Sequence, residues 1–282
     1  MSAWQQADLW TAPDGARLSV RRMPATTAHQ ATAIFLHGWG DHTGRWAHVA
    51  EWFAGRGIAF YGADQRGHGQ TPGRRGHVER FAQYLADLAA LRKLAAAESP
   101  GPQILVGHSY GGFVVLRYLE TAPQGVAGAC LLAPFVELFE EPPRWKVLMA
   151  RLLADVLPWL PIATGLEYDD LSRDAEVVRT FHDDPLCHER MTPRAYREMM
   201  TNFDVLRREQ SRIAGPLFVA LAGDDRIVST PAADAFARSL PGDVTIRQYA
   251  GMYHNILHEP DQDRVFADLE AWLASILTKV AA

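Results

Sequence analysis

A Gly-x-Ser-x-Gly pentapeptide between a strand pattern and a helix pattern constrains this chain more than any other feature. The apolar run at residues 104–106 predicts a buried strand, and residues 107–111 continue it as Gly-His-Ser-Tyr-Gly. From Phe113 onward, apolar residues recur at helical spacing. In this context the pentapeptide is typical of a nucleophile elbow, a sharp turn that presents the serine hydroxyl at the carboxyl end of a sheet. The sequence therefore predicts Ser109 as a nucleophile.

Strand and helix patterns alternate along most of the chain. A hairpin pattern at residues 9–23 comes first, and a helix pattern at residues 261–277 closes the sequence. Strand patterns lie at residues 31–37, 57–63, 104–106, 126–132, 216–221 and 244–249. The run at residues 31–37 is continuous and apolar, which is typical of a strand covered on both faces. Such alternation predicts an α/β fold with a mostly parallel central sheet flanked by helices.

Residues 135–213 interrupt this alternation. They contain proline-rich helical patterns and no strand pattern, so we expect an all-helical cap inserted into a core domain formed by residues 1–134 and 214–282. An apolar face at residues 145–157 would roof a substrate pocket or pack on the sheet domain, with Leu148, Leu152 and Leu153 as candidate pocket residues. Transient contact of this face with a membrane surface is the alternative, although its polar side carries few basic residues.

A serine nucleophile needs a base to take its proton and a carboxylate to orient that base. In folds with this elbow, the acid and then the histidine follow the serine along the chain. Asp224 and Asp225 come after one predicted strand, and His254 comes after the last one. Neighbouring side chains of an extended segment point to opposite sides, so only one aspartate can reach the histidine, and we favour Asp225. His258 competes with His254, but we expect it to open the closing helix.

The strand predicted at residues 31–37 runs into a His-Gly-Trp-Gly sequence at residues 37–40. Paired glycines would let the backbone N–H of Trp39 turn inward beside that of Tyr110, the residue after the nucleophile. We therefore predict these two N–H groups as the donors of an oxyanion hole.

Composition excludes several other classes of protein. The 282 residues carry a net charge of −5 and are 48% apolar, so we expect no nucleic-acid partner. The N-terminus shows no signal-peptide pattern, and no apolar run reaches membrane-spanning length. The two cysteines, Cys130 and Cys187, do not form a disulfide framework. We therefore predict a cytoplasmic protein.

Two rival readings of the motifs predict a cofactor. Gly38 and Gly40, with Asp64 after the next strand, partly match a dinucleotide fingerprint, but the third glycine is displaced. His182, Cys187 and His188 could suggest a metal site, but they lack the paired spacing of metal ligands. We therefore expect neither a cofactor nor a metal.

Taken together, the motifs of the chain outside residues 135–213 resemble those of the monoacylglycerol lipase and lysophospholipase family of α/β-hydrolases. They are His-Gly-Trp-Gly-Asp-His-Thr-Gly-Arg at residues 37–45, Asp-Gln-Arg-Gly-His-Gly at residues 64–69, Gly-His-Ser-Tyr-Gly-Gly at residues 107–112, Asp225-Arg226 and Tyr253-His254. The resemblance implies an α/β-hydrolase fold with a cap over an acyl pocket, and Ser109, Asp225 and His254 as the triad. Trp39 and Tyr110 would be the oxyanion donors. Gly223 stands only two residues before Asp225, closer than is usual in that family.

The resemblance implies a serine hydrolase of carboxylic esters, with a monoacylglycerol or lysophospholipid-like lipid as the small-molecule substrate. A peptidase, a thioesterase or an acyltransferase could use the same triad, and a non-catalytic ligand-binding protein could use the same fold. The sequence leaves the acyl length, the leaving group and the oligomeric state open.

Overall fold

Eight strands form one twisted sheet in the order β1-β2-β4-β3-β5-β6-β9-β10 in the computed structural model, which describes Trp4 and residues 6–140 and 143–281. The strands are β1 Ala7–Thr11, β2 Arg17–Met23, β3 Ala31–Leu36, β4 Ile58–Ala63, β5 Gln103–His108, β6 Val126–Leu132, β9 Leu217–Ala222 and β10 Val244–Tyr249. The β1–β2 and β2–β4 pairs are antiparallel, and the other pairs of this sheet are parallel. The predicted α/β class is confirmed.

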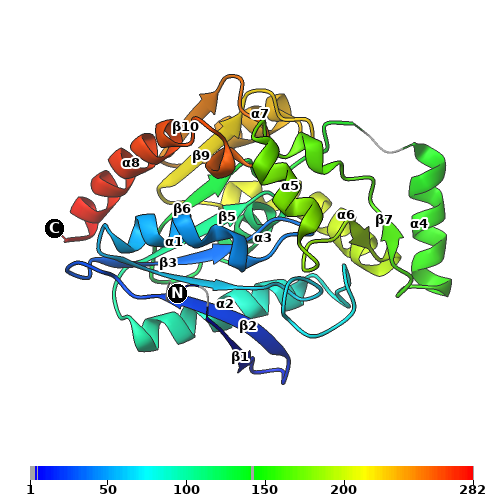
Figure 1. Cartoon of the computed structure of the whole chain (residues 1–282), viewed down its shortest axis with the longest axis horizontal. Helices are drawn as coiled ribbons and strands as arrows, with labels where there is room; N and C mark the ends of the chain where they lie inside the picture. The colour runs from blue at the N-terminus through cyan, green and yellow to red at the C-terminus, as the bar shows by residue number, and fades with distance from the viewer. Residues whose placement is uncertain (1–3, 5, 141–142, 282) are drawn as a thin grey trace.

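Helices cover both faces of this sheet (Figure 1). One layer is formed by α1 Ala47–Ala54 and α8 Asp263–Ala281, and the opposite layer contains α2 Ala82–Glu98, α3 Tyr110–Leu119 and α7 Thr230–Ser239. Successive strand residues point to opposite layers. In β6, Ala129 and Leu131 pack with α2, α3 and α7, whereas Cys130 and Leu132 pack with α1 and α8. Burial on both sides explains why the central strands β3, β4, β5, β6 and β9 are mainly apolar runs in the sequence.

The sheet changes direction between β3 and β5. From β3 the chain steps to β4 on one side, whereas β5 pairs on the other side of β3. The carboxyl ends of β3 and β5 lie side by side, with Leu36 opposite Gly107. Ligands of open α/β sheets bind outside the carboxyl ends of the strands at such a switch point. The fold thus brings the loop after β3 beside the Gly-x-Ser-x-Gly turn.

The segment between β6 and β9 is mainly helical and lies at one end of the sheet (Figure 1). Its elements are α4 Arg144–Val156, β7 Ile162–Ala163, η3 Tyr168–Asp170, α5 Ala175–Asp183, β8 Arg190–Met191, α6 Pro193–Glu209 and η4 Gln210–Arg212. The expectation of an all-helical segment is wrong in one respect, because β7 and β8 pair as a two-residue antiparallel ladder. Strands this short leave too few residues for an alternating pattern.

Helix α6 has a capped start, since the Thr192 side chain accepts a hydrogen bond from the Ala195 N–H and Pro193 occupies the first turn. Its buried residues, including Met199 and Phe203, pack in the same cluster as α2 and α3. By contrast, α4 stands at the far end of the molecule and packs on α6 (Figure 1). Within the described ranges, no helix is both long enough and apolar enough to cross a membrane.

Candidate active site

Ser109 occupies the turn between β5 and α3 in a strained backbone conformation. Its φ is 50° and its ψ is −117°, which a residue with a side chain rarely adopts. Its N–H donates to the Leu132 carbonyl at 2.9 Å, and its carbonyl accepts from Phe113 and Phe135. A Cβ at Gly111 would overlap the carbonyl oxygen of Leu36, so only glycine lets α3 start against β3. This is the geometry of the predicted elbow.

His254 and Asp225 form a buried pair. The imidazole Nδ1 lies 2.7 Å from Asp225 Oδ2, and the two residues are 2% and 4% exposed. Asp225 Oδ1 accepts the N–H groups of Ile227 and Val228 at 2.8 and 2.9 Å. The carboxylate is therefore fixed, and it holds the proton on Nδ1 so that Nε2 is left to accept one. Asp224 is exposed, so Asp225 is the aspartate that reaches the histidine.

Adjacent strands bring these two side chains together. Asp225 follows β9 and His254 follows β10, and the two strands are parallel neighbours with Ala222 opposite Tyr249. Both residues therefore leave the sheet at the edge where Ser109 follows β5. The predicted triad members come from three strand ends of one sheet edge, a placement suited to catalytic groups on a rigid scaffold.

The rival His258 has a different environment. It ends the short helix η5 Ile256–His258, and the expectation that it opens the closing helix is wrong, because α8 begins at Asp263. Its Nε2 donates to the Arg45 carbonyl at 3.2 Å. Burial, followed by repulsion from His48, lowers the pKa of His258 to about 3. The side chain is thus a neutral donor that supports the loop.

The loop of residues 37–40 lies against the nucleophile, because a Cβ at Gly38 would stand 3.3 Å from the Ser109 Cβ. His37 braces this loop: its Nδ1 donates to the Gly38 carbonyl at 2.7 Å, and its Nε2 accepts the Gln65 N–H at 3.0 Å. Burial lowers the pKa of His37 and keeps it neutral, as these two bonds require. Within the described part of the chain, the N–H groups of Trp39 and Tyr110 have no hydrogen-bond partner. They are thus free to act as the predicted oxyanion donors.

The segment around β8 packs directly on this loop, a contact the sequence does not predict. The Trp39 Nε1–H donates to the Arg190 carbonyl at 3.0 Å, and the His188 N–H donates to the Gly40 carbonyl at 2.9 Å. Gly40 has φ +74°, and a Cβ there would overlap the His188 carbonyl oxygen. The loop of residues 37–40 is therefore held by the segment between β6 and β9 as well as by the sheet domain.

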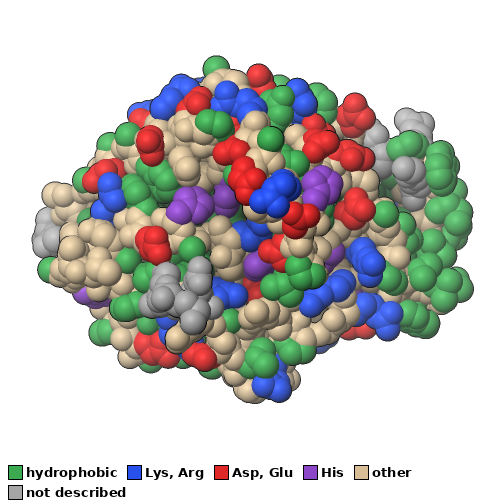
Figure 2. Space-filling view, viewed as in Figure 1, with side chains coloured by type: hydrophobic (Ala, Val, Ile, Leu, Met, Phe, Trp, Pro, Cys, Tyr) green, Lys and Arg blue, Asp and Glu red, His purple; other side chains and the backbone are tan. Residues whose placement is uncertain are grey.

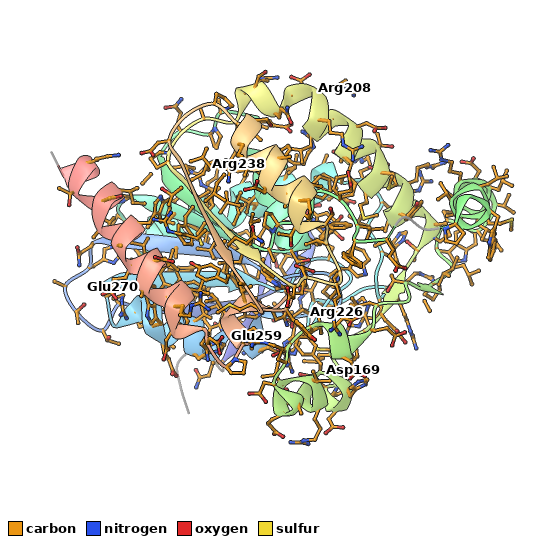
Figure 3. The ribbon with its side chains drawn as sticks, turned by 90° about the horizontal axis from the view of Figure 1, so that it is seen from above. Asp169, Arg208, Arg226, Arg238, Glu259 and Glu270 are labelled. Atoms are coloured by element: carbon orange, nitrogen blue, oxygen red, sulfur yellow. The ribbon has the colours of Figure 1, made fainter. Side chains whose placement is uncertain are left out.

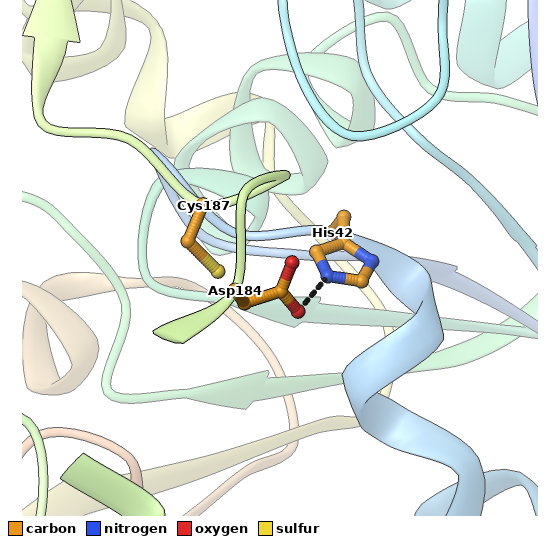
Figure 4. Close-up of side chains that lie close together, drawn as sticks. All are labelled: His42, Asp184 and Cys187. Carbon is orange, nitrogen blue, oxygen red and sulfur yellow. Dashed lines mark hydrogen bonds and ion pairs between the residues drawn. The ribbon is translucent and has the colours of Figure 1, made fainter. Parts of the chain in front are cut away.

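A second contact joins the same two regions at His42, Asp184 and Cys187, whose polar side-chain atoms lie within 4.8 Å of one another (Figure 4). His42 Nε2 donates to Asp184 Oδ2 at 2.8 Å, while its Nδ1 accepts the Gly44 N–H at 3.1 Å. Nε2 therefore keeps its proton and has no lone pair for a metal ion. Burial raises the pKa of the Cys187 thiol, so the thiol does not readily lose the proton that it must lose to bind a metal ion. No pattern in the sequence predicts this contact.

The three residues of the alternative metal-site hypothesis lie in different environments. The buried His188 donates from Nε2 to the Gly67 carbonyl at 2.9 Å, and burial lowers its pKa to about 4. His182 is exposed and lies 3.8 Å from Asp169. Cys187 is the only one of the three beside His42 and Asp184. The structure thus does not bring His182, Cys187 and His188 together.

Two of the three candidate pocket residues of α4 face solvent. Leu148 and Leu152 are 58% and 56% exposed, and Leu153 is partly buried. In this conformation the first two do not point into the protein interior, so their role in a pocket stays a prediction. They belong to an apolar surface over α4 that Figure 2 shows at the right end of the molecule. The other large apolar residues exposed on the described part of α4 are Trp145, Met149 and Val156.

Comparison with known proteins places this chain in a family. The family described as "Serine aminopeptidase, S33" matches residues 27–261. A monoacylglycerol lipase from Mycolicibacterium smegmatis is 29% identical over 273 residues, covering 96% of this chain and 92% of that protein. A phospholipase from Bacillus subtilis is 26% identical over 245 residues, covering 86% and 94%. The crystal structure of the Paleococcus ferrophilus monoacylglycerol lipase has a TM-score of 0.83 at 27% identity, covering 92% and 99%. The chain therefore belongs to the serine aminopeptidase S33 family of α/β-hydrolases.

Proposed function

We propose that this protein, a serine hydrolase of carboxylic esters, cleaves monoacylglycerols and related single-chain lipid esters through an acyl-enzyme intermediate. The observation that carries the mechanism is the buried 2.7 Å bond between His254 Nδ1 and Asp225 Oδ2, at the sheet edge that also carries the strained Ser109. The monoacylglycerol lipase relatives, which cover nearly the whole chain, support the substrate class.

In the first half-reaction, the Ser109 hydroxyl attacks the ester carbonyl while His254 Nε2 takes its proton. The N–H groups of Trp39 and Tyr110 stabilise the oxyanion of the tetrahedral intermediate. His254 then gives the proton to the leaving alcohol, and the acyl group remains on Ser109. In the second half-reaction, His254 takes a proton from water, which attacks the acyl carbonyl, and the proton returns to Ser109 as the fatty acid leaves.

The test is labelling with a fluorophosphonate, followed by hydrolysis of p-nitrophenyl esters of increasing acyl length, monoacylglycerols and lysophospholipids. The wild type should be labelled at Ser109 and should hydrolyse monoacylglycerols, whereas Ser109→Ala should keep the fold and lose both properties. A wild type that resists labelling would instead be a ligand-binding protein with this fold. Labelling without monoacylglycerol hydrolysis would overturn the substrate class alone.

A peptidase activity is the second candidate, because the family carries the description of a serine aminopeptidase. The same acyl-enzyme steps can cleave an amide if the site also binds a free amino group. Aminoacyl p-nitroanilides tested beside the esters distinguish the two activities. Faster turnover of the anilides than of any ester would favour the peptidase.

We further propose that the apolar surface of α4 touches the lipid surface from which the substrate comes. Leu148, Leu152 and Val156 follow one another at helical spacing and are 58%, 56% and 71% exposed. Water contact of such large apolar groups is unfavourable, and transfer of one leucine side chain out of water is worth about 2 kcal/mol. Helix α4 packs on α6, and its apolar face is exposed, so this face can contact a lipid surface.

Sedimentation with phosphatidylcholine vesicles tests this contact. Leu152→Asp should lower the vesicle partition coefficient at least about tenfold, given about 2 kcal/mol per leucine. Leu9→Asp is the matched control, because Leu9 is 45% exposed on β1. Hydrolysis of a dissolved long-chain ester separates the two roles of Leu152. Unchanged hydrolysis together with weaker vesicle binding supports surface contact, whereas a loss specific to long chains indicates a pocket wall.

A cytoplasmic location is also part of this proposal. Cys130 and Cys187 are both free thiols, which is the state expected in a reducing compartment.

A further inference from the structure

Three consecutive residues of the inserted segment hold the loop that follows His254. The Leu171 carbonyl accepts the Asn255 N–H at 2.8 Å, directly beside the histidine. The Ser172 hydroxyl donates to the His258 carbonyl at 3.0 Å. The next residue, Arg173, continues this row of contacts. The loop is therefore fastened along its length from outside the core domain.

Arg173 binds the far end of the loop through Glu259. Its backbone N–H donates to Glu259 Oε1 at 2.7 Å, and its Nε donates to Glu259 Oε2. The Glu259 side chain is fully buried, whereas that of Arg173 is 33% exposed. A buried carboxylate without a partner is strongly unfavourable, so this pair fixes both residues in place. Arg173 Nη2 also donates to Asp261 at 3.1 Å, which orients the guanidinium.

The core holds the other side of the same loop. His48 Nε2 donates to the Leu257 carbonyl at 2.7 Å, and His258 donates to the Arg45 carbonyl. Ile256 and Leu257 are fully buried between these contacts. The loop of residues 254–259 is therefore clamped between the core and the inserted segment, and the Arg173–Glu259 pair closes the clamp on the inserted side.

We propose that Arg173 and Glu259 are positioning residues for His254, which fix the loop so that the imidazole faces Ser109. This inference rests on the proposed roles of Ser109 and His254. Asp225 sets the direction of the imidazole ring through Nδ1, but only the backbone of the loop sets where the ring stands. Displacement of a reacting group by about 1 Å can cost about 100-fold in rate.

The same region offers a matched control. A hollow of about 620 Å³ lies beside the catalytic loops and is lined by both Arg173 and Arg179. Figure 3 labels Asp169 and Arg226, two other residues of its wall, and Glu259 at the end of the clamped loop. Among the residues that the structure describes, Arg179 pairs with Glu176 and Asp183 alone, both in its own helix. Its removal therefore takes a charge from the hollow without releasing the His254 loop.

The experiment compares Arg173→Ala, Arg173→Lys and Arg179→Ala by kcat and KM for p-nitrophenyl acetate and by the rate of fluorophosphonate labelling. Arg173→Ala should lower kcat and the labelling rate at least about tenfold with KM within about twofold, because the nucleophile is activated less well while binding is kept. Arg173→Lys should restore part of the loss, since the lysine can donate one hydrogen bond to Glu259. Arg179→Ala should equal the wild type.

Glu259→Gln is the milder variant if Arg173→Ala does not fold, because its amide oxygen still accepts the Arg173 N–H. It should lie between Arg173→Ala and the wild type in kcat. A wild-type kcat in folded Arg173→Ala or Glu259→Gln, or a change in KM alone, would overturn the inference. So would a loss no larger than the drop in folded protein seen by circular dichroism. An inactive, unlabelled wild type would instead overturn the proposed function.

Discussion

Acid should destabilise this protein well above the pH at which its carboxylates titrate, because several histidines are buried in the neutral form. Burial lowers the pKa of His37, His68, His108 and His188 below the ordinary value. The unfolded chain therefore binds more protons than the folded protein below about pH 6.5. The free energy of unfolding should fall as the pH drops through that value, and the fall should continue down to the folded-state pKa values.

His188 allows the size of the effect to be worked out. Its pKa is lowered to about 4 by burial, while the hydrogen bond to the Gly67 carbonyl opposes the shift. A histidine with a pKa of about 6.5 when unfolded then removes about 2 kcal/mol of stability between pH 7 and pH 5. Total stabilities are about 5–15 kcal/mol, so this one side chain is a measurable fraction.

Urea unfolding followed by tryptophan fluorescence, at pH 7 and at pH 5, measures this contribution. His188→Gln keeps a donor for the Gly67 carbonyl but cannot take a proton. Its loss of stability between the two pH values should be smaller than that of the wild type by about 2 kcal/mol. His29→Gln is the control, because His29 is exposed, and it should lose as much as the wild type. Equal losses in His188→Gln and the wild type would refute the reasoning.

Two further predictions concern the triad. Asp225→Asn should lower kcat by about 10⁴, because the asparagine no longer selects the imidazole tautomer, whereas Asp224→Asn should stay within a few-fold of the wild type. Matched kcat measurements on one ester check this, and a large loss at Asp224 alone would contradict the geometry. His254→Ala should abolish ester hydrolysis, while His258→Ala should retain it in the fraction of protein that folds. Residual rates normalised to folded protein test the pair, and the reverse order would exchange the two histidines.

The parts of the fold that depend on local patterns could be predicted from the sequence. The central strands appear as apolar runs because both faces are covered. Each triad motif follows a predicted strand, which places Ser109, Asp225 and His254 at one edge. Helix α7 escaped prediction because its fully buried positions are the small residues Ala233 and Ala237. Alanines give only a weak periodic hydrophobic signal.

Contacts between the inserted segment and the core could not be predicted. Arg173 and Glu259 are 86 residues apart, and each reads in the sequence as an ordinary solvated charge. Pairing at that separation leaves no periodicity to detect. In α4 the spacing of Leu148 and Leu152 correctly predicts an apolar face. The spacing does not indicate whether protein, lipid or water covers that face.

The neighbouring positions of β6 and β9 have a consequence for building chimeric enzymes. The two strands are parallel, so the chain must travel back along the sheet between them, and α6 with η4 leads directly into β9. A chimera that receives a foreign segment therefore needs its own α6 to make this return, but it does not need its own α4 or α5. A segment exchanged between relatives should therefore begin after β6 and end at Thr192, before α6. The donor segment will suit the recipient only if it also supplies a partner for Glu259.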